Sequence, residues 1–166
     1  MRYVVMVMLM TLTCFDLNAA QAATADQRES LRGLPGVGLV IEDIDAEAKA
    51  DGLSVEAIRT AVELILRSSS IRILTRTEVS NTTSGAYLYV QAATYKIRSG
   101  LYAYTTTVAL RQSVSLVQRP QQTIFASTWD RVYVGSPGSQ NISWLINPIE
   151  DSVKIFANDF VAVNPR

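Results

Sequence analysis

The sequence predicts an α+β fold, in which a β-α-β unit and then a three-strand meander form one mixed, mainly antiparallel sheet with two helices packed on one face. Three observations predict it. Residues 87–134 are rich in β-branched and aromatic side chains, which suit extended strands. Turn residues interrupt this run twice and divide it into three strands. One amphipathic helical pattern precedes the run and another follows it, so both helices can cover the same face.

The first 22 residues have the layout of a secretory signal peptide. A short positive start precedes an apolar stretch, and residues 20–22 (Ala-Gln-Ala) fit the small-residue cleavage pattern. The apolar stretch, residues 3–15, is shorter than the ~20 residues that a membrane-spanning helix needs, although a buried or anchoring helix is an alternative. A lipoprotein signal at Cys14 would need a small residue where Thr13 stands. We therefore expect cleavage, a periplasmic location and no transmembrane segment in the mature chain.

The mature chain is expected to begin with a flexible lead-in, residues 23–36, and to continue as a single domain, residues 37–163. Residues 37–44 predict a short first strand. Four acidic residues crowd the connection after it: Glu42, Asp43, Asp45 and Glu47. Carboxylates can hold a hard divalent cation, but the spacing lacks the glycine and the distant glutamate of an EF-hand loop. We interpret the cluster as a solvated loop and assign no metal site.

The first helical pattern covers residues 53–68, and Ser54 is a suitable N-cap. Its apolar stripe has helical spacing: Val55, Ile58, Val62 and Ile65. Residues 71–74 predict a second short strand, parallel to the first through a βαβ crossover. Residues 76–85 are polar and predict an irregular connection.

The meander is predicted as three strands and two turns. Residues 87–98 form the first strand, and Gly100 supplies the positive φ of a tight turn. Residues 101–117 alternate between two faces, as expected of a strand with one buried side. Residues 118–122 contain a proline and predict the second turn, because proline cannot donate to a central ladder. Residues 123–134 form the third strand.

A second helix is predicted over about residues 141–161. Its buried stripe is Ile149, Val153, Phe156 and Phe160. Pro148 permits two interpretations: it begins the helix, or it kinks a helix that starts near Ile142.

The composition argues against catalysis. The chain has no histidine, the commonest general base and metal ligand, and its only cysteine lies in the predicted signal peptide. It carries 15 basic and 15 acidic residues, so net charge gives no reason to expect nucleic acid as a partner. Spacing pairs no two carboxylates in the central region, and no glycine-rich loop joins a strand to a helix as phosphate binding requires. We therefore expect a protein that is not an enzyme and has no cofactor.

Tyrosines and basic residues gather around the first hairpin of the meander. They form the candidate interaction surface: Tyr87, Tyr89, Tyr95, Tyr102, Tyr104, Lys96, Arg98 and Arg111. Such aromatics can stack on a sugar or on side chains of a partner. They can equally pair across the sheet and stabilise it.

The order of elements resembles a small α+β domain of bacterial envelope proteins. Five stretches carry the resemblance: residues 37–43, 54–67, 71–76, 87–97 and 156–160. Domains of this kind occur in three places: at the N-terminus of TolB, the propeller protein of the Tol–Pal system, in the periplasmic part of the curli secretion channel, and in related flagellar accessory proteins. The resemblance implies docking to other envelope proteins or ring formation.

Together, these features predict an exported, non-enzymatic domain that binds an envelope protein or its own copies through a sheet face or an edge strand. Peripheral association with the outer membrane is a further expectation. The alternative is a small-molecule or glycan-binding module that uses the tyrosine-rich hairpin.

Overall fold

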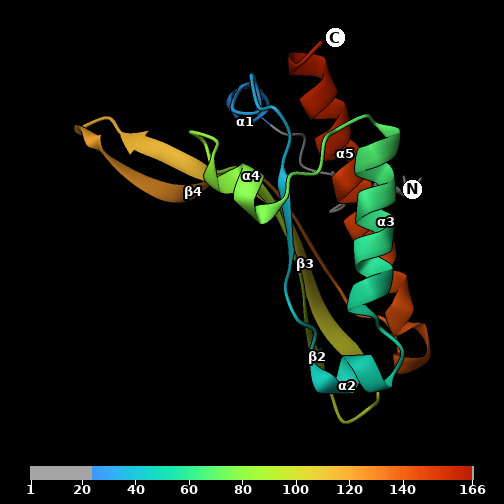
Figure 1. Ribbon diagram of the computed structural model, residues 1–166. Helices are drawn as coiled ribbons and strands as arrows, with labels where there is room; N and C mark the ends of the chain where they lie inside the picture. Colours follow the sequence, from blue (N-terminus) through green and yellow to red (C-terminus); the bar gives the residue numbers. More distant parts are fainter. Residues whose placement is uncertain (1–23, 166) are drawn as a thin grey trace, which may run out of the picture.

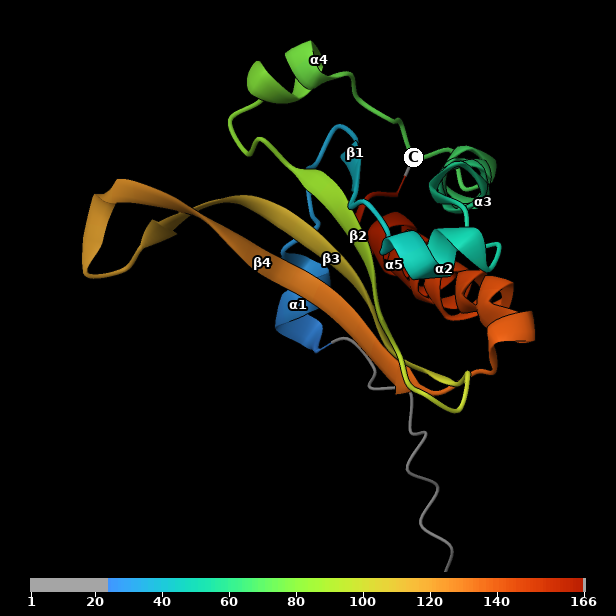
Figure 2. The same ribbon diagram turned by 90° about the horizontal axis from the view of Figure 1, so that it is seen from below.

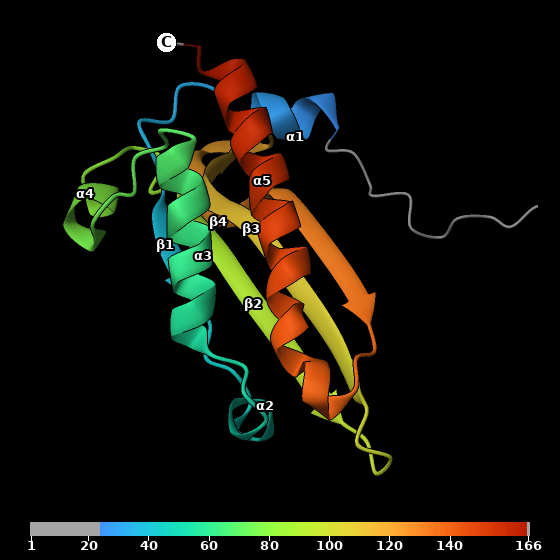
Figure 3. The same cartoon turned by 90° about the vertical axis from the view of Figure 1, so that its right-hand side faces the viewer.

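The computed structural model describes residues 24–165, so the predicted signal peptide lies outside the described residues. Its four-stranded sheet has the order β1-β2-β3-β4. β1 (Gly38–Ile41) is parallel to β2 (Tyr87–Lys96), and β3 (Tyr102–Leu116) and β4 (Arg119–Gly135) continue the sheet antiparallel. Two long helices, α3 and α5, lie side by side on one face (Figures 1 and 3). The predicted α+β fold class is confirmed.

The two long helices begin where the sequence indicates. α3 (Val55–Ser68) is capped by Ser54, whose hydroxyl accepts a hydrogen bond from the Ala57 N–H at 3.3 Å. α5 (Ile146–Val163) follows a 3₁₀ helix, η1 (Ser139–Leu145). Pro148 lies in the first turn of α5, where an N–H group has no partner within the helix. Pro148 therefore belongs to the start of the helix.

The hydrophobic core lies between these helices and the sheet. Its buried residues come from α3 (Ile58, Val62, Leu66), from α5 (Ile149, Val153, Phe156) and from the strands (Leu88, Val90, Val108, Leu110, Trp129). Trp129 and Phe156 meet edge to face with ring centroids 5.2 Å apart, a favourable arrangement for two aromatic rings.

Part of the segment predicted as a flexible lead-in, residues 23–36, forms a helix and packs on the core. Residues 25–29 form helix α1 (Ala25–Glu29), which has a capping box between Thr24 and Gln27. Leu31 is fully buried in the core. Asp159 of α5 joins α1 and β4 to that helix. Its carboxylate accepts hydrogen bonds from Arg28 Nε of α1 at 2.9 Å and from Trp129 Nε1 of β4 at 3.0 Å.

The second predicted strand is reduced to a single bridge. Ile73 pairs in parallel with Val37, but residues 71–74 form no strand of the sheet. After Leu74 the chain turns away into α4 (Arg76–Ser80), which begins with a capping box between Thr75 and Glu78. The crossover that contains α3 therefore joins β1 to β2. α2 (Ala46–Ala50) is a short helix between β1 and α3.

Strands β3 and β4 extend beyond β2 as a two-stranded arm, residues 112–126 (Figure 2). Their turn is only Val117 and Gln118, so the predicted turn over residues 118–122 is too long. Pro120 lies within β4 instead. An edge strand tolerates proline because its outer side needs no ladder hydrogen bond.

Candidate functional site

The sheet has a face covered by α3 and α5 and an opposite, open face. Side chains alternate between these faces along each strand, and the pairing register sets which residues of neighbouring strands lie together. Tyr95 pairs with Ala103, which places Tyr87, Tyr89 and Tyr95 on the open face. Tyr102 and Tyr104 lie on the helix-covered face. The five tyrosines therefore form no single surface, contrary to the prediction.

Tyr102 and Lys96 hold α2 to the sheet. The fully buried Tyr102 donates its hydroxyl to Asp51 Oδ2 at 2.8 Å, and Lys96 Nζ lies 2.6 Å from the same oxygen. The hydrogen bond from Lys96, followed by that from Tyr102, lowers the pKa of Asp51. The bond to Asp51 also raises the pKa of Lys96, and burial is the main cause of the raised pKa of Tyr102. This charged network is structural, and neither Tyr102 nor Lys96 is free to bind a partner.

Tyr89, Arg111 and Glu42 form a polar belt across the middle of the open face. The Arg111 guanidinium carbon lies 3.7 Å from the centre of the Tyr89 ring, a close cation–π contact. Burial raises the pKa of Tyr89, and the nearby Glu42 carboxylate raises it further while Arg111 opposes the shift. The belt divides the open face into two regions.

The first region, which we call the uncharged face, lies toward the C-terminal ends of β2 and β4. It has eight open-face residues, none of them charged: Gln91, Ala93, Tyr95, Ala103, Thr105, Thr107, Val132 and Val134. Tyr95 is 72% exposed, Val132 52% and Val134 78%. Within the described residues no further strand pairs with the outer edge of β4. An exposed apolar strand at a free edge is suited to binding another chain.

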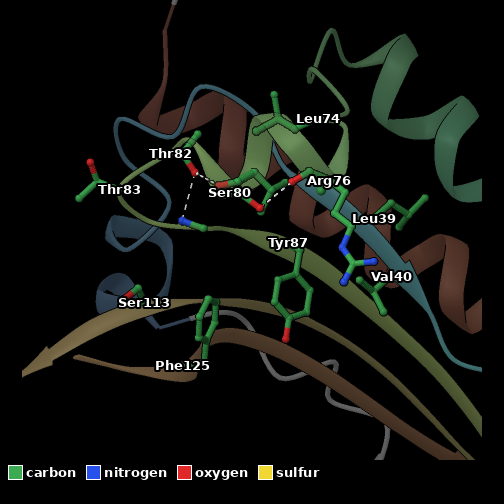
Figure 4. Close-up of a pocket in the computed structure, with 13 residues that line it drawn as sticks. Leu39, Val40, Leu74, Arg76, Ser80, Thr82, Thr83, Tyr87, Ser113 and Phe125 are labelled. Atoms are coloured by element: carbon green, nitrogen blue, oxygen red, sulfur yellow. Dashed lines mark hydrogen bonds between the residues drawn. The ribbon is translucent and has the colours of Figure 1, made fainter. Parts of the chain in front are cut away.

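The second region is a pocket between α4 and the beginnings of β1 and β2. Its volume is about 740 Å³, and Figure 4 shows its lining side chains. Its apolar walls are Leu39, Val40, Leu74, Val79, Tyr87 and Phe125. The Tyr87 and Phe125 rings are tilted, with centroids 6.1 Å apart. The guanidinium of Arg76 reaches down from α4 toward Tyr87 and Val40.

The eight residues of the predicted interaction surface are therefore distributed over several places. Tyr95 lies on the uncharged face, Tyr87 lines the pocket, and Tyr89 and Arg111 belong to the polar belt. Tyr104 is half-buried and packs against the core. Arg98 is exposed in the turn between β2 and β3.

Sequence reasoning missed Val132, Val134 and Arg76. The two valines alternate along the predicted third strand, a period of two that marks a common face. Arg76 lies within a Thr-x-x-Glu capping-box pattern, Thr75 to Glu78, which indicates a short helix where an irregular connection was predicted.

The acidic residues after β1 have separate roles. Asp43 pairs with Lys49 at 2.6 Å, and Asp45 caps α2 by accepting a hydrogen bond from the Glu47 N–H at 2.8 Å. Across residues 24–165, no group of three or more acidic, histidine or cysteine side chains converges as a metal site requires.

Comparisons with models of protein families, with curated proteins and with solved structures gave no match. The resemblance to the envelope domains stays a prediction. None of the helices within residues 24–165 combines the length and the apolar character that crossing a bilayer requires.

Proposed function

We propose that the chain is an exported, non-enzymatic domain of the bacterial cell envelope that binds another envelope protein or a second copy of itself. The contact surface is the uncharged face together with the adjoining edge of β4. The observation that carries the proposal is the exposure of Tyr95, Val132 and Val134 on a face whose eight residues are all uncharged. Charged side chains begin at its border, where the exposed Asp130 precedes Val132 by two residues. The predicted signal peptide and the resemblance to envelope domains support the location.

The chemistry of this face favours a protein partner. The centres of protein interfaces are depleted in charged residues and enriched in aromatic ones. Burial of apolar area stabilises a complex by roughly 25 cal/mol per Å² before the costs of association are subtracted. Strand addition to the β4 edge would also satisfy its outward backbone groups and set the register of the partner.

The alternative, a small-molecule or glycan module built on the tyrosine-rich hairpin, has less support. Such a module needs several aromatic rings on one surface. Tyr102 is buried and bonded to Asp51, while Tyr89 is covered by Arg111.

The experiment that tests the proposal is site-specific photo-crosslinking in intact cells, with the photoreactive residue at position 95. We expect a discrete cross-linked product, and we expect the double change Val132→Asp and Val134→Asp to remove it because charge on this face opposes its burial. The matched control is Val117→Asp at the tip of the arm, where the valine is 91% exposed but lies outside the uncharged face. A product that persists in the double variant would contradict the proposal.

A further inference from the structure

The outer edge of β1 carries backbone groups without a partner among the described residues. Gly38 and Glu42 direct their N–H groups to β2, where the Ala86 and Val90 carbonyls accept them at 3.0 and 2.9 Å. In a parallel ladder the intervening residues, Leu39 and Ile41, then direct their N–H and C=O groups to the opposite edge.

Only the first position of that edge is paired. Val37 donates its N–H to the Arg72 carbonyl at 3.0 Å and accepts from the Leu74 N–H at 2.8 Å. The chain then leaves the sheet for α4. No segment within residues 24–165 therefore pairs with the outer edge of β1 at Leu39 and Ile41.

Helix α4 overhangs this edge and closes the pocket from above. Its contact with β1 is tight, because a Cβ atom at Gly38 would stand only 2.8 Å from Val79 Cγ2. Arg76 extends from α4 over the pocket (Figure 4). Its guanidinium makes no ion pair or side-chain hydrogen bond with the described residues, whereas the nearby Arg72 pairs with Glu78.

We infer that this edge and its pocket bind an extended, acidic segment of a partner protein, which adds a strand beside β1. The unpaired groups of Leu39 and Ile41 would hold its backbone. Alternate side chains of an added strand point to the same face, so two of them, two positions apart, enter the space under α4. One is apolar or aromatic and packs against Tyr87 and Phe125. The other is Asp or Glu and pairs with Arg76.

A peptide fits these features better than a free small ligand does. The pocket volume of about 740 Å³ lies within the range of ligand sites, roughly 300–1,000 Å³, but a small apolar molecule would leave the edge amides unpaired. The site lies across the polar belt from the uncharged face. It is therefore a second docking point that goes beyond the proposed function and does not depend on it.

The test uses the purified mature chain, residues 23–166, and a random heptapeptide phage library. We expect the selected sequences to share an aromatic or large aliphatic residue two positions from Asp or Glu. A synthetic peptide of that consensus would then be titrated by fluorescence anisotropy. Arg76→Glu should weaken its binding about tenfold or more, the scale of a lost charge pair at a partly desolvated site. Arg98→Glu, which changes an exposed arginine in the β2–β3 turn, is the matched control and should leave the affinity unchanged.

Two further measurements separate the contribution of the Arg76 charge pair from that of the backbone hydrogen bonds. The same peptide with Lys in place of its acid should bind Arg76→Glu better than it binds the wild-type chain. N-methylation of the peptide backbone, one residue at a time, should reduce affinity about tenfold at a position whose N–H pairs with Leu39 or Ile41, because the added strand loses a ladder hydrogen bond there. Arg76→Gln, a milder change, serves if Arg76→Glu alters the circular dichroism spectrum.

The inference is overturned if the library yields no such consensus. It is also overturned if binding is insensitive to both the Arg76 changes and N-methylation, or if a free apolar carboxylate such as octanoate binds as tightly as the peptide. The double change Val132→Asp and Val134→Asp should leave peptide affinity unchanged. A failure here is thereby distinguishable from a failure of the proposed function.

Discussion

Trp129 and Val132 lie on the same strand but on opposite faces of the sheet. Trp129 is fully buried, packs against Phe156 and donates its indole N–H to Asp159, whereas Val132 is 52% exposed. The same contrast holds across the meander: alternate residues of β2, β3 and β4 face either the helices or the open side of the sheet. The helix-covered face therefore supplies folding stability, whereas we expect changes at the exposed side chains of the uncharged face to cost little stability.

The open face is itself divided. The pocket has a shaped apolar wall and a cation, whereas the uncharged face is a set of exposed side chains without charge. Specific recognition of one side chain suits the first, and a broad contact with another folded surface suits the second. The contrast between the helix-covered face and the open face can be tested by substituting residues on each face and measuring the stability of the variants.

The largest difference is expected between Trp129→Ala and Val132→Ala. The first removes a fully buried aromatic and should lower the free energy of unfolding by about 3–5 kcal/mol. The second truncates a half-exposed side chain and should change it by about 0.5 kcal/mol or less. Urea denaturation followed by circular dichroism measures both. Equal decreases in the free energy of unfolding would mean that the open face stabilises the fold as much as the helix-covered face does.

A smaller difference is expected between two aspartates near α1. Asp159→Ala removes the acceptor for Trp129 and the charge partner of Arg28, and the buried indole N–H left without a partner should cost about 1–3 kcal/mol. Asp130→Ala removes an exposed acceptor for Gln27 Nε2, at 3.1 Å, and should cost about 0.5 kcal/mol or less. The measurement is the urea midpoint at neutral pH. A greater loss of stability from Asp130→Ala than from Asp159→Ala would contradict the conclusion that the covered side of the sheet stabilises the fold more than the open side.

The smallest expected effect is the dependence of stability on pH through Asp51. Its pKa in the folded protein is lowered, first by the hydrogen bond from Lys96 and then by that from Tyr102. The contribution of Asp51 is therefore present above the unfolded pKa of about 3.9 and is lost as pH falls through the lower folded pKa. The urea midpoint should fall between about pH 5 and pH 3, and Asp51→Asn should fall less over that window. Identical pH profiles for the two proteins would show that this network contributes nothing to acid stability.

Much of the fold could be predicted from local patterns. The alternation of the strands, the Ser54 cap and the stripes of α3 and α5 depend on neighbours in the chain, so a single sequence contains them. The capping boxes that begin at Thr24 and Thr75 were also present as Thr-x-x-Gln and Thr-x-x-Glu. They were missed because both stretches are otherwise polar and resemble loops.

The candidate surface was predicted less well, because it depends on register. Alternation placed Tyr102 and Tyr104 together and showed that the strand had two faces. It did not relate them to Tyr87, Tyr89 and Tyr95 on the preceding strand. A shift of one residue across a hairpin transfers every side chain to the other face. The pairing of Tyr95 with Ala103 therefore decided which tyrosines are exposed on the open face.

The amino-acid sequence by itself determined the class of this protein: strands and helices in that order, a predicted export signal, and no histidine for catalysis. Only the tertiary structure decided which surfaces carry the contacts that we propose. The strand register and the overhang of α4 at Gly38 arise from contacts between residues far apart in the chain. So do the edges of β1 and β4 with which no other strand within residues 24–165 pairs, and no local pattern encodes such contacts.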